Sequence, residues 1–406
     1  MPPPSSTRAR VEAALLVVLA FVMPLWEAPK NLLVVAYLIT WLVNRTRTGD
    51  YGGSWDRWDT LIALWIASGF AVAAGSGIHA QEWHGALDIV RYGSILWCLR
   101  RSRETVWTGF AVVLSLALGT AAGLAWGYWV WTFDSKRYYV ELHSVGHVNH
   151  SAIYTAMVLG ATASVVFAAW DRLSVPMRAG GIIALLYFMF FLVKMQSRAA
   201  LGVGIAVVVV HGLAWYPRKR LFAGLALALA LALTTTLIVF RPDVVAKHLT
   251  DVQNQNVLAF RDQIWRTSLA AWRQFPVFGV GMDNYSFISR ERVAGWASAR
   301  GDAFDESGFF FTSHGHSLFF NTLAERGTAG TAVLAMVLAA WLASLVRGYP
   351  GANGGEAAWL AWGGAASAWL VTVGAGFANT TLHHEHGLLA AILFGLWLAH
   401  EKTARS

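Results

Sequence analysis

The chain has 406 residues, of which 56% are hydrophobic and only 13% are charged, with a formal net charge of +8. A soluble globular domain carries roughly 25% charged residues, so this composition excludes a large soluble enzyme and indicates a protein that crosses a membrane several times. The 21 Trp and 11 Tyr fit the aromatic belts found at bilayer interfaces. The single cysteine, Cys98, excludes intramolecular disulfides and metal sites built from cysteines. Nucleic acid is not predicted as a partner, because the basic residues lie mainly in short connections between apolar runs.

Twelve apolar segments are predicted to be membrane helices, since a span needs about 20 mostly apolar residues. The first follows Arg8-Ala9-Arg10, as in a signal peptide, but no clear cleavage site comes after it, so we expect it to be retained. The first two and the last are short and could be tilted or partly interfacial. In chain order the segments are 11–26, 30–44, 59–78, 84–99, 104–131, 150–170, 178–194, 198–216, 220–240, 316–346, 356–378 and 386–400.

One long polar loop interrupts these segments. The predicted fold class is therefore all-α: a polytopic membrane protein of about 12 transmembrane helices with one long loop that contains an amphipathic helix. We expect one integrated membrane domain. Residues 1–240 form its first nine helices, residues 241–315 form the loop, and residues 316–406 form its last three helices.

Lys and Arg residues gather at both termini and in every second connection between the predicted helices, and they are sparse in the other short connections. Because cytoplasmic loops carry the excess of Lys and Arg, both termini are predicted to be cytoplasmic and the long loop to lie outside. In a double-membrane bacterium this describes a multi-pass protein of the inner (cytoplasmic) membrane whose long loop is periplasmic. An active site in or beside that loop is then periplasmic too.

Histidines follow the same asymmetry, because most of them fall in or beside the predicted outside connections. This pattern points to chemistry on the outer face, although polar residues also favour loops in general. A metal site is not predicted, since neighbouring residues of a run such as His383-His384-Glu385-His386 point in different directions on a helix. No phosphate-binding or dinucleotide glycine motif is present either, and no cofactor is predicted. The outer histidines are His79, His84, His143, His147, His150, His248, His314, His316, His383, His384 and His386.

Arg198 departs from these rules, because it opens the eighth predicted helix on the outer side, directly after Ser197. A cation at a helix N-terminus opposes the helix dipole, and the positive-inside trend also disfavours it. Free amide groups and a guanidinium at a helix start together make a good anion site. The alternative is an arginine that extends to lipid headgroups.

The long loop contains a predicted amphipathic helix over residues 257–275, which Pro276 ends. Arg261 and Trp265 are four residues apart and share a face, whereas Arg266 lies about 140° round the helix from Arg261. One rigid helix therefore does not aim both arginines at the same ligand, and each could instead be a solvated surface charge. The loop holds equal numbers of acidic and basic residues, so a phosphate ligand would have to be met by specific arginines.

His316 is predicted to begin the tenth helix, where the helix dipole disfavours the imidazolium form. A neutral imidazole accepts a proton from a sugar hydroxyl near neutral pH. His314 is its nearest rival for this role. Gly327 and Gly330, further along the same helix, allow close helix packing. Glu325 lies well inside the apolar run, where it either balances an arginine or serves the packing of the bundle.

With these features the chain resembles the O-antigen ligase family, within the wider group of ligases, polymerases and O-oligosaccharyltransferases. The resemblance covers most of the chain and rests on three motifs in order. They are Ser197-Arg198 at an outer helix start, Arg261 and Trp265 followed by residues 276–281 (PVFGVG), and His316-Ser317 followed by Gly327 and Gly330-Thr331. Many members of the group have Asn after the histidine, and Ser317 is a form found among ligases.

The resemblance implies a donor glycan on undecaprenyl pyrophosphate and, for a ligase, an acceptor sugar on lipid A–core. It implies an inverting transfer that needs no metal. His316 would be the catalytic base on the acceptor hydroxyl, and Arg198 and Arg261 would bind the pyrophosphate and stabilise its growing charge. Secondary candidates for the site are Arg266, His314, Trp265 and Ser197.

Two further readings stay open. An O-antigen polymerase or a protein O-oligosaccharyltransferase uses the same donor with a different acceptor. A transporter or flippase of an anionic lipid-linked glycan would use the same arginines for binding alone, although transporters often show repeated halves, which this sequence lacks. A membrane scaffold is the simplest alternative, and the outer position of Arg198 argues against it.

Overall fold

The computed structural model describes residues 6–102, 106–134, 139–215 and 260–405, together with the single positions 220, 224, 228 and 231. These residues form α-helices and two short 3-10 helices, with no strand among them, in agreement with the predicted all-α class. In chain order the elements are α1 (Thr7–Val22), α2 (Glu27–Thr48), α3 (Arg57–Gly75), α4 (Glu82–Arg100), α5 (Val106–Phe133), α6 (Val148–Ala169), α7 (Val175–Lys194), α8 (Arg198–Trp215), α11 (Arg261–Gln274), η1 (Tyr285–Phe287), α12 (Arg290–Ala299), η2 (Glu306–Gly308), α13 (Leu318–Arg347), α14 (Glu356–Gly376) and α15 (His384–Arg405).

A helix lies at each predicted membrane span except 220–240, which falls almost wholly outside the described residues. Six helices of the described chain are both long and apolar enough to cross a membrane, namely α3, α5, α6, α7, α8 and α13. The protein is therefore a helical membrane protein. The number of twelve spans stays a prediction.

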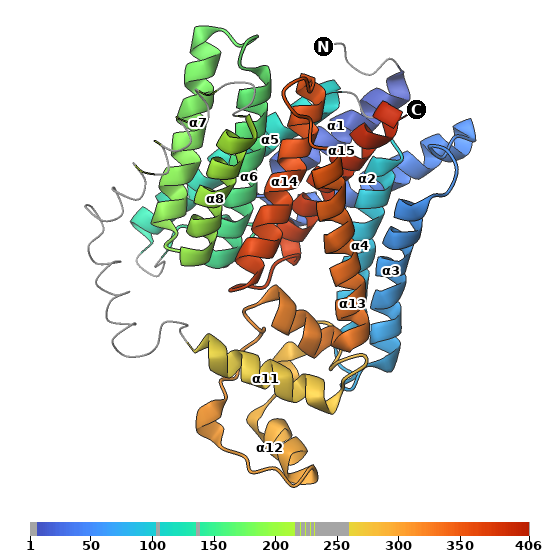
Figure 1. Ribbon diagram of the computed structural model, residues 1–406, viewed down its shortest axis with the longest axis vertical. Helices are drawn as coiled ribbons and strands as arrows, with labels where there is room; N and C mark the ends of the chain where they lie inside the picture. The colour runs from blue at the N-terminus through green and yellow to red at the C-terminus, as the bar shows by residue number, and fades with distance from the viewer. Residues whose placement is uncertain are drawn as a thin grey trace.

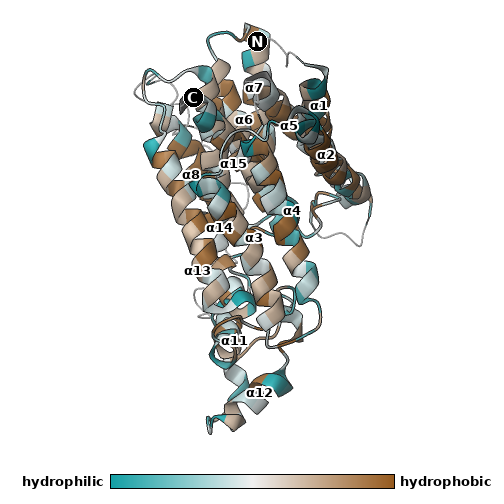
Figure 2. Cartoon of the chain, turned by 90° about the vertical axis from the view of Figure 1, so that its right-hand side faces the viewer, coloured by the Kyte–Doolittle hydropathy of each residue, from teal (hydrophilic) through white to brown (hydrophobic). Residues whose placement is uncertain are grey.

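The long helices form a bundle with the two termini at one end and α11 and α12 at the other (Figure 1). Hydrophobic residues run along the bundle, and hydrophilic residues gather toward its two ends (Figure 2). Some outward faces are strongly apolar: Val175, Ile183 and Phe190 of α7 are all exposed. Such faces suit lipid rather than water. The bundle therefore carries α11 and α12 at one face of a membrane.

The centre of the bundle is α6, which small residues bring close to α14. A Cβ atom on Gly160 of α6 would lie 2.2 Å from the hydroxyl of Ser367, and one on Gly363 of α14 would lie 2.2 Å from the hydroxyl of Ser164. The buried His211 of α8 fills the junction, where its Nε2 lies 3.0 Å from the Ser164 hydroxyl. Small residues and interhelical hydrogen bonds are the usual means of packing helices in a membrane.

A buried charge cluster holds the end of the bundle that carries the termini. Asp59 of α3 is fully buried and accepts from Arg100 at 2.9 Å and from Arg101 at 2.6 Å. Arg101 also donates to carbonyl groups of the connection between α2 and α3. The side chain of Lys402 donates to the Gly52 carbonyl in the same connection, which ties α15 to it. Because each buried charge has a partner, the cluster is compatible with burial.

The described part of the loop, from residue 260, packs beneath the other end of the bundle with a small hydrophobic cluster of its own. Ile264 and Ala271 of α11 contact Val280, Tyr285 and the connection between α3 and α4. The same connection is hydrogen-bonded to the loop, since the amide of residue 77 donates to the carbonyl of residue 279 at 2.9 Å. The loop is thus a folded element attached to the bundle.

Most helix starts differ from the predicted boundaries by a few residues, and two of these differences concern the candidate site. The loop helix begins at Arg261, because Phe260 has the left-handed φ of 61°; residues 257–259 lie outside the described residues. The tenth predicted helix begins at Leu318, and His316 precedes it with φ 44°. A helix cannot continue through a left-handed residue, so both corrections have a local conformational cause.

α13 is broken at Gly327, which has φ 58° and ψ −164°. The sequence predicted only close packing at this glycine, within an unbroken helix. Residues 276–281 cross the break. The amides of Thr328 and Ala329 donate to carbonyls of this segment at 2.8 and 3.0 Å, and two of its amides donate to carbonyls on the other side of the break, both at 2.9 Å. The PVFGVG segment therefore satisfies backbone groups that the break exposes.

Candidate active site

Arg198 opens α8 as predicted, at the end of the bundle that faces α11. The turn before it is left-handed at Gln196, which has φ 58°. Ser197 is 4% exposed, and its hydroxyl has no hydrogen-bond partner within the described part of the chain. The side chain of Arg198 is exposed. A guanidinium and a buried hydroxyl therefore lie together at a helix N-terminus.

Arg261 is half-buried at the start of α11, and its Nε donates to the carbonyl of Ala378 at 2.9 Å. This bond ties the loop to the segment that follows α14. Burial and the nearby charge of Arg198 lower the pKa of Arg261. Two guanidinium groups from α8 and α11 are thus held near each other, and an anion between them would relieve their repulsion.

His316 lies in a tight turn whose neighbours are held on both sides. The Gly315 amide donates to Oδ1 of Asn321 at 2.7 Å, and the Ser317 hydroxyl donates to the Gly376 carbonyl at 3.2 Å. Burial, followed by the charges of Arg261 and His147, lowers the pKa of His316 to about 4. The ring is therefore neutral near pH 7 and can accept a proton.

Left-handed residues mark all three predicted site residues. Gln196 stands two positions before Arg198, Phe260 stands directly before Arg261, and His316 is itself left-handed. Residues other than glycine adopt this conformation rarely, at a cost of order 1–3 kcal/mol each, and such strain concentrates at functional sites. The surrounding packing holds three strained turns from distant parts of the chain at one place.

Histidine rings gather around His150 in a group that we call the histidine cluster, and His316 joins this group through His314. The ring centres of His316 and His314 are 4.2 Å apart, and those of His314 and His150 are 6.1 Å apart. His150 and His386 share a hydrogen bond of 2.8 Å between ring nitrogens. Over the described residues, no three His, Cys, Asp or Glu side chains are arranged to hold a metal ion. The cluster consists of His147, His150, His314, His316, His383, His384 and His386.

Sequence reasoning placed all these histidines on one side of the membrane but selected only His314 and His316 as site candidates. The others come from the start of α6 and from residues 383–386, far away in the chain. The only signal for them in the sequence was their common place on the predicted outer side of the membrane. That they meet His314, the neighbour of His316, is a result of packing.

The secondary candidates take different places. Arg266 is exposed, and its guanidinium lies on the side of Gly308, away from the Ala378 carbonyl that Arg261 contacts. Trp265 stacks on Phe320 of α13, with ring centres 4.9 Å apart. His314 remains the neighbour of His316; burial and the other histidines lower its pKa to about 3. The predicted separation of Arg261 and Arg266 on the helix is thus observed.

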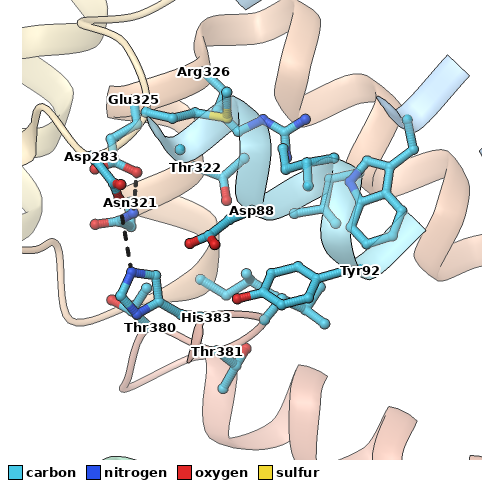
Figure 3. A pocket seen from close by; sticks show the side chains of 17 residues that line it. Asp88, Tyr92, Asp283, Asn321, Thr322, Glu325, Arg326, Thr380, Thr381 and His383 are labelled. Atoms are coloured by element: carbon cyan, nitrogen blue, oxygen red, sulfur yellow. Dashed lines mark hydrogen bonds and ion pairs between the residues drawn. The ribbon is translucent and has the colours of Figure 1, made fainter. Parts of the chain in front are cut away.

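Glu325 supports the His316 turn through Asn321. Its Oε2 accepts from the Asn321 side chain at 2.8 Å (Figure 3). Its Oε1 accepts from the Tyr285 amide at 3.4 Å. Within the described chain Glu325 forms no direct ion pair, although its charge acts on the adjacent, buried Arg326. Asn321 in turn holds the Gly315 amide, so Glu325 fixes the turn indirectly.

Comparison with known proteins agrees with this geometry. No curated protein matches the chain. Residues 181–335 match the family described as O-Antigen ligase, which implies a glycosyltransferase of the ligase or polymerase type. The matched segment contains Arg198, Arg261, His316 and the Gly327 break. This segment of the chain is therefore similar to the O-antigen ligase family.

Proposed function

We propose that the protein transfers an O-antigen glycan from undecaprenyl pyrophosphate to a sugar hydroxyl of lipid A–core, and so completes lipopolysaccharide. One observation carries this proposal: Arg261 and Ser317, the residue after His316, donate to carbonyls two residues apart, those of Ala378 and Gly376. The charges of Arg198 and Arg261 act on this same place. A base for the acceptor and two cations for the donor pyrophosphate are therefore close together.

In this mechanism Arg198 and Arg261 bind the donor pyrophosphate. They stabilise the negative charge that grows on its oxygen as the bond to the anomeric carbon breaks. His316 accepts the proton of the acceptor hydroxyl, and the hydroxyl oxygen forms the new bond to the anomeric carbon. Direct displacement inverts that carbon. Pyrophosphate is a good leaving group, so no strong general acid is needed, and undecaprenyl pyrophosphate is the second product.

The position of the site suits two lipid substrates. The end of the bundle opposite to both termini lies beside α11 (Figure 1). Arg198 and Arg261 begin α8 and α11, and His316 lies two residues before α13. We assign this end to the periplasm, the termini to the cytoplasm and the bundle to the inner membrane, on the basis of the positive-inside trend. Donor and acceptor then reach the site from the outer leaflet of that membrane.

Two other functions use the same residues. An O-antigen polymerase or a protein O-oligosaccharyltransferase differs in its acceptor alone. A transporter of an anionic lipid-linked glycan binds the pyrophosphate without breaking a bond. A transporter has no need of a base, so the neutral imidazole beside the arginines favours glycosyl transfer.

The test is transfer by His316→Asn in purified protein, with lipid-linked donor, lipid A–core acceptor and a chelator present. Asn tolerates a left-handed backbone better than Ala, so this variant removes the base with little added strain. His143→Asn is the matched control, because His143 is exposed and outside the histidine cluster. We expect His316→Asn to bind donor but to lose transfer, and the control to keep both.

Each other outcome has a definite meaning. Full transfer by His316→Asn would refute His316 as the base and turn attention to His314. Activity of the wild type that depends on a metal, and is lost in chelator, would refute metal-independent transfer. Donor binding by the wild type without transfer to lipid A–core would favour the polymerase or transporter functions.

A further inference from the structure

A polar cavity of about 80 Å³ lies beside the His316 turn, and the mechanism above does not use it. It is lined from α3, α4 and α13, and from the connection between α14 and α15. Figure 3 shows the side chains of its walls pointing around one space. Its hydrogen-bonding groups include Asp88, Asp283, Asn321, Glu325, Thr380 and His383.

One wall carries a hydroxyl without a partner. Thr380 is only 7% exposed, and its Oγ1 has no hydrogen-bond partner among the described residues. On the same wall, Nδ1 of His383 is also buried and without a partner. Buried polar atoms are almost always hydrogen-bonded, because leaving one unsatisfied is costly. A polar cavity of this size has room for several water molecules, or for the hydroxyl groups that displace them.

The cavity is connected directly to the turn of the proposed base. Asn321 lines the cavity and also accepts from the Gly315 amide at 2.7 Å. Leu318, two residues after His316, lines it as well. A molecule in the cavity is therefore held beside the histidine turn, which is where an acceptor hydroxyl must be.

The cavity and the arginines differ in chemistry and in origin. Arg198 and Arg261 reach the site from α8 and α11, and neither lines the cavity. The cavity instead presents the carboxyl groups of Asp88, Asp283 and Glu325, together with one buried arginine, Arg326, whose guanidinium donates to the Ser68 hydroxyl at 2.8 Å. Although burial opposes it, hydrogen bonds from His383 and His84 lower the pKa of Asp283, so this carboxyl is charged near pH 7. Carboxylates repel a pyrophosphate but accept hydrogen bonds from neutral sugar hydroxyls.

We propose that this cavity receives the hydroxyl-bearing edge of the acceptor saccharide, an uncharged sugar ring whose free hydroxyl then meets His316. This inference rests on the proposed glycosyl transfer. In a displacement with inversion, the acceptor and the leaving group lie on opposite faces of the donor sugar, so the acceptor pocket must adjoin the base and be separate from the arginines. The cavity satisfies both conditions.

Two substitutions test the cavity. Thr380→Val removes the unpartnered hydroxyl at nearly constant volume, and Thr372→Val is its control, since Thr372 is also buried with an unpartnered hydroxyl but does not line the cavity. Asp283→Asn removes a charge and keeps a residue that tolerates its φ of 59°. Its control is Asp262→Asn on the exposed side of α11.

The measurements are the KM for lipid A–core, the affinity of the donor-free protein for lipid A–core oligosaccharide, and donor binding. We expect the acceptor KM to rise about 3- to 10-fold for Thr380→Val and about 10- to 100-fold for Asp283→Asn, as for the loss of a neutral and a charged hydrogen bond. Donor affinity and both controls stay at the wild-type values. Thr380→Ser restores the hydroxyl and should restore the KM.

Unchanged acceptor affinity in Thr380→Val and Asp283→Asn would overturn the inference and leave the cavity to water. An equal loss of donor affinity would also overturn it, since the change would then be structural. Failure of the proposed function looks different. If the wild type extends a second lipid-linked glycan and not lipid A–core, the ligase assignment fails, and the cavity is tested by the KM for that second glycan.

Discussion

The break in α13 gives the sharpest test of how the loop is attached to the bundle. Gly327→Ala adds one methyl group at φ 58° and ψ −164°, where its Cβ would lie 2.3 Å from the Val277 carbonyl oxygen. That oxygen belongs to the 276–281 segment, which crosses the break. The backbone cannot yield locally, because this carbonyl also accepts from the Ala329 amide at 3.0 Å. The substitution must therefore separate the segment from α13.

The expected loss of docking free energy of the loop has two parts. A side chain in this region of φ and ψ costs about 1–3 kcal/mol. Four backbone hydrogen bonds join the 276–281 segment to α13, and each is worth about 1 kcal/mol net. If half of them are lost, we expect docking of the loop to weaken by about 3–5 kcal/mol. Arg261 is carried by the same loop, so transfer should fall with docking.

Amide hydrogen exchange of residues 261–281 in detergent micelles measures this effect, alongside transfer and thermal unfolding. Gly202→Ala is the matched control, because Gly202 lies in α8 with nothing within 4 Å of an added Cβ. Alanine should favour that helix by about 1 kcal/mol or less. Faster exchange in Gly327→Ala alone supports the account. Protection equal to that of the wild type would refute it, because the segment would then not need the glycine.

Three further predictions follow from single residues. Asp59→Asn leaves two buried arginines without their shared carboxylate, so the free energy of unfolding should fall by about 3–5 kcal/mol. Asp262→Asn, at an exposed position, should not change it. Equal thermal stability of the two variants would contradict the role of the buried ion cluster. Arg261→Gln removes a cation that lowers the pKa of His316, which is about 4 in the wild type. The acid limb of the profile of kcat/KM against pH should therefore move to higher pH. An acid limb at the wild-type pH would show that the charge of Arg261 does not act on His316. Donor affinity should fall about 10- to 100-fold in Arg261→Gln and stay unchanged in Arg266→Gln, measured by donor binding; equal losses would show that both arginines face the donor.

Much of the helical architecture was predictable because its signal is local. Apolar length placed helices at all the predicted spans that the structure describes, and helical periodicity placed α11. The wrong starts of the loop helix and of α13 also have local causes, because Phe260 and His316 have left-handed backbones. No sequence pattern predicts a left-handed residue of those types. The break at Gly327 depends on a partner segment 50 residues away and so could not be seen in α13 alone.

For the candidate site too, the sequence predicted some features and only the tertiary structure gave the others. The sequence predicted its three main residues: Arg198 from its unusual place at an outer helix start, and Arg261 and His316, over Arg266 and His314, from the motif spacing of the resembling family. Only the tertiary structure decided that Arg261 rather than Arg266 approaches Arg198, that His150 of α6 gathers a histidine cluster next to His314 and His316, and that a cavity adjoins the His316 turn. The physical reason is that hydropathy and helical period act over a few residues, whereas these contacts join segments far apart in the chain through packing.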